Sequence, residues 1–292
     1  FDLLHAHNTY PVGVVAALAA KTMRRPYGIT EHGDLLVDGR RQPQSFLSRR
    51  ALVGADFVIA ASRELVELVV ECGAEREKSV AFINAVDVER FHPGIAGSPW
   101  RERLGFPRDA VICLSLRRLV DKCGVQHVVR LAPRMIEKAP QLCFVLAGEG
   151  PLRSILQAEV QERGLAPHFR FLGTVPNDET PQLIAACDFA VYPSFAEATS
   201  VSALEVMAMA RPVVASDVGG LPEIVFPEET GLLVPFHVRE STYGDLGLLP
   251  DSEEGLIAAV LRMVHDDDAR RRMGEGARRF VVENASWPAY VA

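Results

Sequence analysis

The stretch PSFAEATSVSALEVMAMARPVVASDVGGLPEIV, residues 193–225, decides the fold. It follows the apolar run FAVYPS and contains a helical segment from near Thr199 or Ser200, then a second apolar run, PVVAS. A buried strand, a helix and another buried strand in this order are typical of a parallel α/β sheet. Only two charges, Glu197 and Glu205, occur between residues 194 and 210. They need an explanation because burying an unpaired carboxylate costs several kcal/mol.

Glu205 is expected to lie on the packed side of its helix. The residues at i−4, i+3 and i+4 are all apolar: Val201, Ala208 and Met209. A capping box, Ser202-x-x-Glu205, would explain the carboxylate if the helix began at Ser202, but only two turns would then precede Pro212. We favour the alternative that Glu205 is a buried acceptor for sugar or ribose hydroxyl groups, since each carboxylate oxygen can accept a separate O–H.

The alternation of short apolar runs with helical periods continues in both directions and predicts two α/β halves. Expected strands cover 1–7, 26–33, 55–62, 79–87, 110–116, 142–150, 169–175, 189–194, 212–216 and 230–235. Expected helices cover 12–23, 43–53, 63–72, 125–138, 151–164 and 179–187, the helix that contains Glu205, and a tail from about Glu253. Ser62 is expected to cap the helix at 63–72 and Gly73 to end it. Residues 236–252 resemble a loop.

The segment RFHPGIAGSPW, residues 90–100, is the best linker candidate because it contains Pro and Gly and lacks periodicity. We therefore expect a partial first domain at 1–97 and a second domain at 98–292. The fold class is α/β, with two doubly wound parallel sheets. The opening FDLLHAHN reads at once as a buried strand, so the first domain is expected to lack its leading strands.

Bulk composition excludes several classes of protein. The 292 residues are 48% hydrophobic and 24% charged, as in an ordinary globular protein. The net charge of −7 with dispersed basic residues argues against a nucleic-acid partner. Five cysteines without a CxxC pair indicate free thiols in a reducing compartment, and no apolar run reaches the ~18 residues of a membrane span. These features favour a cytoplasmic location.

Ligands of open parallel sheets bind beyond the carboxyl ends of the strands, so residues just after each strand are site candidates. In the first half these are His5, His7, Asn8, Glu31, His32 and Gly33. In the second half they are Arg117, Arg118, Lys122, Gly148 to Gly150, Val175, Ser194 to Glu197 and Asp217 to Gly220. A cleft between the two halves would collect these groups.

Each candidate has a plain structural alternative. His5 is best explained as a hydrogen-bonded histidine at a strand end, and no third ligand supports a metal site with His7. GEGP at 148–151 fails the dinucleotide fingerprint, but it allows either a close approach of the backbone to phosphate or a simple tight turn. The cations Arg117, Arg118 and Lys122 suit phosphate oxygens, and a charged surface is the alternative. The basic run in the tail is best explained as a solvated helix face.

The chain resembles the retaining glycosyltransferases of family 4, which have the GT-B fold. This resemblance implies two Rossmann-like domains that face a cleft, the first of them incomplete. The resemblance depends on Glu197-x7-Glu205 with VMAMARPVVAS and GGLPEIV, and on an ordered series of further segments. These are HAHN, TEHG, ADFVIAAS, INAVDVERFHP, RRLVDKCGV, LAGEGPLR and FLGTV. The resemblance covers most of the chain, and the series is more specific than any single motif.

The resemblance implies a nucleotide-diphospho-sugar donor and assigns roles to individual residues. Arg118 matches the arginine that binds the diphosphate, and Glu205 the acid that accepts ribose hydroxyls. Glu197 and His32 match groups that contact the donor sugar and are the expected catalytic residues. The remaining donor-binding candidates act through the backbone or lie near the phosphate and base: Lys122, Gly148, Val175, Ala198, Thr199 and Ser200.

Several positions depart from the family pattern. Cys123 occupies the place of the family lysine, for which Lys122 is a substitute one residue earlier. EATS replaces the usual EGFG, which alters the shape of the loop and bears on donor choice. Ala85 in NAVD and Ala210, where Gly is usual, are expected to be tolerated packing changes.

The function implied is transfer of a sugar from a nucleotide-diphospho-sugar to an acceptor hydroxyl with retention of anomeric configuration, without a metal or other cofactor. An epimerase-like GT-B enzyme and a non-catalytic nucleotide-sugar-binding protein are the alternatives. The acceptor is a glycan, a lipid or a small molecule, and contact with the inner face of a membrane is left open. Because the leading strand, the Gly-rich loop and the closing helix of the family are not found, the chain is expected to be incomplete and weakly active or inactive.

Overall fold

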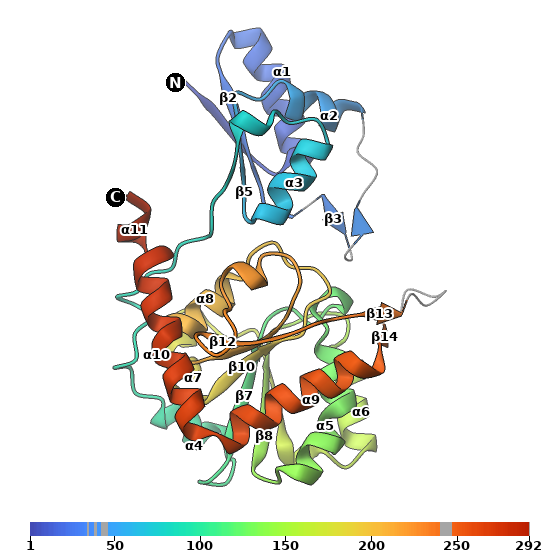
Figure 1. Ribbon diagram of the computed structural model, residues 1–292, viewed down its shortest axis with the longest axis vertical. Coiled ribbons are helices and arrows are strands. Elements are labelled where there is room, and N and C mark those ends of the chain that lie inside the picture. The colour runs from blue at the N-terminus through green and yellow to red at the C-terminus, as the bar shows by residue number, and fades with distance from the viewer. Residues whose placement is uncertain (34, 38–39, 42–45, 240–246, 292) are drawn as a thin grey trace. The chain divides into compact units, whose positions relative to one another are not determined.

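The computed structural model describes residues 1–33, 35–37, 40–41, 46–239 and 247–291. Contacts divide the chain into two compact units, and each is an α/β structure (Figure 1). Unit 1 contains residues 1–84 with the short segments 196–200 and 219–223. Unit 2 contains residues 85–195, 201–218 and 224–292. The expected division at 97/98 stays a prediction about functional domains.

Unit 1 is built on a four-stranded sheet in the order β1-β2-β5-β6, with all neighbours parallel. The strands are β1 Leu4–His7, β2 Tyr27–Glu31, β5 Phe57–Ala60 and β6 Ser79–Ala81. The helices are α1 Val14–Met23, α2 Phe46–Val53 and α3 Arg63–Glu71, and a short antiparallel pair joins β3 Leu36–Val37 to β4 Arg40–Arg41. Every residue of β2 is buried, as a central strand of a parallel sheet requires.

Helix α3 begins and ends where its sequence predicts. The Ser62 hydroxyl accepts a hydrogen bond from the Leu65 amide at 3.2 Å and so caps the first turn. Leu65, Leu68 and Val69 form a buried stripe toward the sheet. Gly73 follows with φ +112°, a conformation that favours glycine and ends the helix.

Unit 2 contains a six-stranded parallel sheet in the order β12-β11-β10-β7-β8-β9. The strands are β7 Val111–Leu116, β8 Leu142–Ala147, β9 Phe169–Gly173, β10 Phe189–Tyr192, β11 Val213–Ser216 and β12 Gly231–Val234. Along the chain, the strands are added from β7 through β8 to β9 on one side of the sheet, and from β10 through β11 to β12 on the other. The carboxyl edge between β7 and β10 is therefore the topological switch point, where doubly wound sheets bind ligands.

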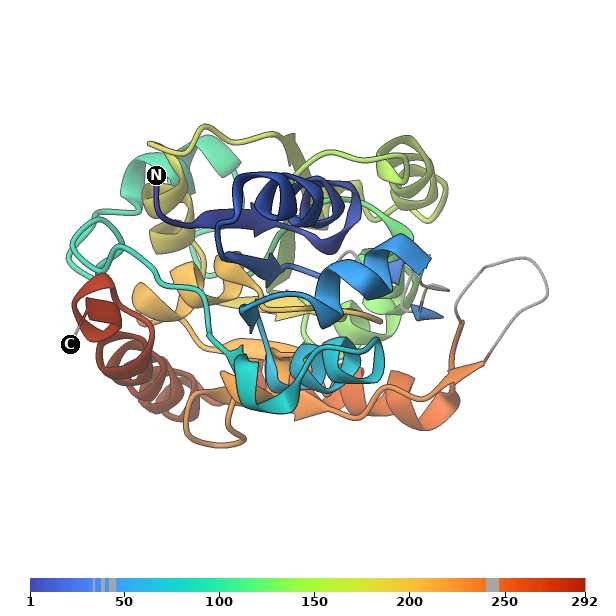
Figure 2. The same cartoon turned by 90° about the horizontal axis from the view of Figure 1, so that it is seen from above.

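Helices surround the six-stranded sheet of unit 2 (Figures 1 and 2). They are α4 Ser98–Leu104, α5 Val125–Lys138, α6 Arg153–Glu162, α7 Thr180–Ala186, α8 Val201–Ala208, α9 Pro250–His265 and α10 Asp267–Asn284, and α11 Trp287–Val291 follows α10 beyond the sheet. Helix α5 packs against α6 and α9, and α8 packs against α10. One apolar core, which includes the stacked rings of Phe144 and Phe169, joins the sheet to α5 and α9.

Some expected boundaries are wrong. The stretch 236–252 is not a plain loop, because β13 Val238–Arg239 pairs antiparallel with β14 Gly247–Leu248 and α9 already begins at Pro250. Helix α4 begins inside the expected linker 90–100, and β6 is shorter than the expected strand 79–87. The expected helix residues 43–45 lie outside the described residues.

Candidate functional site

The loops that follow the central strands of unit 2 are joined to one another through their backbones. Three hydrogen bonds connect the loops after β7, β8 and β10 and the last residue of β9: Leu119 N to Glu149 O (2.9 Å), Gly148 N to Gly173 O (2.7 Å) and Phe195 N to Lys122 O (2.9 Å). The carboxyl edge of the sheet is therefore a connected surface, and it holds Arg118, Lys122, Gly148 and Val175 in one region of unit 2.

Gly148 is required by its own loop. Its φ is +147°, and a Cβ atom there would lie 1.9 Å from the Arg117 carbonyl oxygen. Gly150 is equally constrained, since its φ is +158° and a Cβ atom there would lie 2.2 Å from the Leu119 carbonyl oxygen. Packing between loops thus explains both glycines, and the role of Gly148 in donor binding stays a prediction.

The two arginines after β7 have different surroundings. The Arg117 guanidinium donates to the Ser194 hydroxyl at 2.7 Å and lies over the Tyr192 ring, 5.3 Å from its centroid. It therefore joins the ends of β7 and β10. Arg118 is exposed at the carboxyl edge, where a guanidinium can meet phosphate oxygens.

Cys123 cannot present a polar group to a ligand at this edge. Its side chain is 4% exposed and belongs to the apolar core. Gly124 follows with φ +68°, and a Cβ there would lie 1.6 Å from the Pro193 carbonyl oxygen. Lys122 is half-buried in the same short 3₁₀ turn and is the remaining candidate for the family lysine.

Glu205 lies in the second turn of α8 and is not part of a capping box. The helix begins at Val201, so Ser202 lies inside it and cannot be its N-cap. Burial raises the pKa of Glu205 to about 7, and the nearby Arg90 charge acts in the opposite direction. In the described part of the chain, no group hydrogen-bonds to this carboxyl. A desolvated acceptor without a protein donor is suited to ligand hydroxyls.

In unit 1 the Glu31 carboxylate is a structural group. It is fully buried and accepts hydrogen bonds from the Thr9 hydroxyl (2.6 Å) and from the amides of Thr9 (3.3 Å), Gly33 (3.0 Å) and Leu35 (3.3 Å). These bonds fix the loop after β1 and the turn that carries His32. Although the sequence places Glu31 among the edge residues, its oxygens are directed into the fold.

His32 is paired with His7. The His7 Nδ1 and His32 Nε2 atoms lie 2.8 Å apart, and the rings stack at a centroid distance of 5.1 Å. His5 instead bonds the Thr30 hydroxyl at 2.7 Å, which confirms its expected role as a hydrogen-bonded strand-end histidine. Burial lowers the pKa of His5, and the charge on His7 adds to this effect.

The described residues contain no group of three side chains that could hold a metal ion. This finding concerns the described chain alone, so the expected independence of metal stays a prediction.

The segment that carries Glu197, Ala198, Thr199 and Ser200 clusters with unit 1. Its shape depends on Gly219, which has φ +59° and where a Cβ atom would lie 1.7 Å from the Glu197 carbonyl oxygen. The Gly220 amide donates a hydrogen bond to the same Glu197 carbonyl oxygen at 3.1 Å. Glu197 and Glu205 thus belong to different units, and their contact with one ligand stays a prediction.

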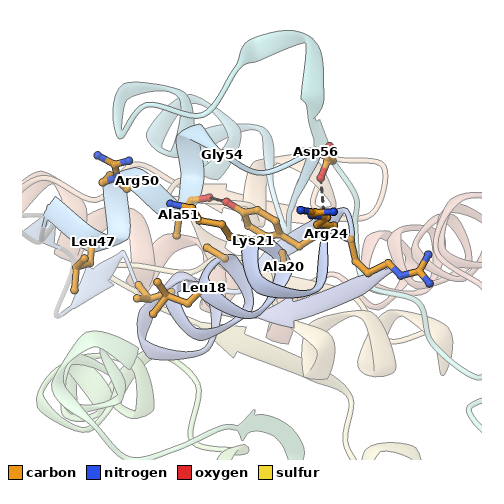
Figure 3. Close-up of a pocket in the computed structure, with 13 residues that line it drawn as sticks. Leu18, Ala20, Lys21, Arg24, Leu47, Arg50, Ala51, Gly54 and Asp56 are labelled. Atoms are coloured by element: carbon orange, nitrogen blue, oxygen red, sulfur yellow. Dashed lines mark hydrogen bonds between the residues drawn. The ribbon is translucent and has the colours of Figure 1, made fainter. Parts of the chain in front are cut away.

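A cavity of about 430 Å³ in unit 1, drawn in Figure 3, lies at the amino end of the sheet rather than at the carboxyl ends of its strands. Tyr27 and Asp56, which line it, lie at the start of β2 and just before β5. Three of its cations, Lys21, Arg24 and Arg50, lie at or near the carboxyl ends of α1 and α2, where helix dipoles favour positive charge. The positions of these cations are therefore explained without a ligand.

Two family descriptions match the chain in succession. Residues 98–280 match Glycosyl transferases group 1, and residues 1–90 match Glycosyltransferase Family 4. The first match alone covers more than half of the chain. The chain belongs to the group 1 glycosyl transferases.

Curated relatives resemble the chain over most of its length. It is 29% identical to 2-deoxystreptamine glucosyltransferase of Streptomyces kanamyceticus, over 82% of this chain and 66% of that protein. It is 28% identical to alpha-maltose-1-phosphate synthase of Mycolicibacterium smegmatis, over 99% of this chain and 76% of that protein. The chain therefore spans about two thirds to three quarters of the length of these relatives.

Solved structures confirm the GT-B fold. The HepE protein of Anabaena in complex with UDP and glucose has a TM-score of 0.81 at 22% identity, over 98% of this chain and 74% of that one. Sucrose-phosphate synthase from Thermosynechococcus elongatus has a TM-score of 0.78 at 24% identity, over 99% of this chain and 71% of that one.

In the described residues, helices are too short or too polar to span a membrane.

Proposed function

We propose that this chain binds a nucleotide-diphospho-sugar and transfers the sugar to an acceptor hydroxyl with retention of anomeric configuration. The observation that carries the proposal is the Glu205 carboxyl, which is desolvated on α8 and has no hydrogen-bond donor among the described residues. Ribose hydroxyls supply the donors that such a group needs. The complex of HepE with UDP and glucose supports a donor of this class.

The diphosphate is assigned to the carboxyl edge of unit 2. Arg118 and Lys122 follow the switch-point strand β7, and the Gly148 loop brings backbone groups to the same edge. Positive groups here stabilise the negative charge that develops on the leaving diphosphate. Val175, in the loop after β9, is assigned to the base.

The sugar is assigned to Glu197, His32 and the amides of Ala198, Thr199 and Ser200. In the proposed reaction, the bond from the anomeric carbon to the diphosphate oxygen breaks and that oxygen keeps the electron pair. The acceptor oxygen bonds the same face of the anomeric carbon, and its proton passes to the departing diphosphate. The chain's part is to place hydrogen-bond acceptors around the sugar and cations around the phosphates.

The remaining parts of the proposal concern the surroundings of the reaction. In the proposed reaction, no metal or other cofactor takes part. The proposed location is cytoplasmic, with contact to the inner membrane face left open. The acceptor is a glycan, a lipid or a small molecule. An epimerase-like enzyme would release a free altered nucleotide-sugar, and a binding protein would show no turnover. Product analysis therefore separates all three functions.

The test is incubation of the chain with UDP-, GDP- and ADP-sugars, followed by measurement of released nucleoside diphosphate and of the anomeric configuration of the product by proton NMR. We expect slow release of nucleoside diphosphate from one donor class, in keeping with the weak activity expected of this chain, and a product with the donor's configuration. Glu197→Gln should abolish most turnover while nucleotide binding persists. An inverted product, or turnover near wild type in Glu197→Gln, would contradict the proposed mechanism.

A further inference from the structure

The segment Val88–Phe91 is held firmly against the end of α8. Arg278 of α10 donates through Nη1 to the carbonyl oxygens of Phe91 (2.7 Å) and Ala208 (2.9 Å). Its Nη2 donates to the carbonyl oxygen of Val88 at 3.2 Å. One half-buried guanidinium thus fixes two residues that flank Arg90 to the carboxyl end of the helix that carries Glu205.

Arg90 extends from this fixed segment to the loop after β9. Its Nη2 donates a hydrogen bond to the carbonyl oxygen of Asn177, two residues beyond Val175. Its guanidinium also lies over the Phe91 ring, 5.3 Å from the centroid, which restricts its orientation. Arg90 therefore supports the backbone of the loop assigned to the base.

Arg90 also acts on Glu205. It is the charged group whose field favours the ionised form of that carboxyl, against the effect of burial. Arg90, Asn177 and Glu205 all belong to unit 2, so this relation lies within one compact unit. Of the two groups that Arg90 influences, the Asn177 carbonyl lies in the loop assigned to the base, and Glu205 is assigned to the ribose.

We propose that Arg90 is a positioning residue for the nucleoside half of the donor, because it holds the Asn177 carbonyl and supplies the counter-charge for the Glu205 carboxylate. The proposal rests on the proposed function. Arginine suits this position because its guanidinium is always charged and its planar fork fixes the direction of the hydrogen bond to Asn177. A lysine would keep the charge but lose the fork, so Arg90→Lys separates the two contributions.

The plain alternative is an exposed arginine that stacks on its neighbouring ring. Unit 2 offers a matched control in Arg103, whose guanidinium lies 4.4 Å from the centroid of the Trp100 ring and pairs with Glu179 at 3.2 Å. Arg103 has the same kind of stacking and is exposed, but its partners belong to α4 and to the N-cap of α7 rather than to the surroundings of Glu205. Arg103→Ala removes an equal charge from the same unit.

The experiment is calorimetric titration of the wild-type chain, Arg90→Ala, Arg90→Lys and Arg103→Ala with UDP, GDP and ADP, at low salt and at about 0.5 M NaCl. We expect Arg90→Ala to weaken binding of the preferred nucleotide about tenfold, as loss of a charge-assisted contact does. The part of the loss that comes from the Asn177 hydrogen bond should persist at high salt, because that contact is short-range. The nucleotide affinity of Arg90→Lys should lie between those of wild type and Arg90→Ala, and the affinity of Arg103→Ala should equal that of wild type.

Three results would overturn the inference. One is equal affinity in Arg90→Ala and Arg103→Ala. Another is a loss in Arg90→Ala that disappears at high salt, which would mean a distant charge effect only. The third is a loss that accompanies a large fall in melting temperature in both Arg90 variants. If the wild-type chain binds none of the three nucleotides, the proposed function itself fails, which is a different outcome.

Discussion

Glu205 makes the stability of unit 2 depend on pH. Its pKa is raised to about 7 in the fold, mainly by burial, from an ordinary value of 4.5. The folded chain therefore keeps this proton to a higher pH than the unfolded chain does. The associated stability is fully present below about pH 4.5 and is lost as the pH rises through about 7.

Replacement of Glu205 by Gln removes this ionisation. We expect Glu205→Gln to have a higher free energy of unfolding than wild type by about 2 kcal/mol near pH 8, and the difference to shrink toward about pH 5. Urea unfolding at both pH values measures it. A difference that stays constant with pH would show that the carboxyl is not desolvated in the fold.

Ala210 occupies a position that favours glycine. Helix α8 ends in a Schellman motif, with hydrogen bonds from the Ala210 amide to the Met207 carbonyl (3.0 Å) and from the Arg211 amide to the Val206 carbonyl (3.2 Å). The φ of Ala210 is +55°. The departure from the family glycine is therefore a backbone effect, and the expectation of a packing change is wrong.

Ala210→Gly should stabilise the chain. Relief of the left-handed strain is offset in part by the greater freedom of glycine in the unfolded chain, which leaves a gain of about 0.5 kcal/mol. A rise in melting temperature is the expected result of thermal unfolding. The exposed residue Ala96 provides a control, because its substitution by Gly touches no such motif and should lower or preserve stability.

At the scale of elements, helix caps could be read directly from the sequence. Ser62 precedes an apolar-periodic run, and the structure confirms its hydroxyl as the cap of α3. Ser62→Ala should lower the free energy of unfolding by about 1 kcal/mol, while Ser62→Asp should retain most of it. Chemical denaturation of both variants measures this difference. An equal loss of unfolding free energy in both would mean that the Ser62 cap contributes little.

The Glu31 carboxylate joins two loops of unit 1, and its loss should be severe. Glu31→Ala leaves several buried donors without an acceptor, so we expect a loss of about 3 kcal/mol in stability. Glu64→Ala, at an exposed position of α3, is the control and should change little. If both variants unfold at the same denaturant concentration, the hydrogen bonds of Glu31 do not stabilise the fold.

Short elements could not be predicted from the periodicity of apolar residues. Strands β13 and β14 have two residues each, which is too few to show an alternation of apolar and polar side chains. Helix α4 has seven residues and begins with Ser-Pro, which also reads as a loop signal. Helix α5 at Val125–Lys138 has the bounds that its periodicity predicts, whereas α9 begins at Pro250, before the expected start near Glu253.

At the scale of the whole molecule, strand and helix alternation predicted two parallel sheets, and both are present. The candidate ligand-binding edge could be predicted from the positions of the strand ends alone. The roles of individual residues at that edge could not. Arg117 and Arg118 are adjacent in sequence, and only the structure shows that Arg117 bonds Ser194. Arg90 was missed because it lies in the expected linker and contacts Asn177, 87 residues away. No local pattern reports such a distant contact.

The spacing of apolar residues around Glu205 did predict its packed orientation, and from it the central claim that this carboxyl receives ribose hydroxyls. The most direct test is a calorimetric cycle of wild type and Glu205→Ala against the preferred nucleoside diphosphate and its 2′,3′-dideoxy analogue. We expect Glu205→Ala to weaken binding of the ribonucleotide about tenfold or more and to leave binding of the dideoxy analogue unchanged. An equal loss for both ligands, or none for either, would contradict the claim.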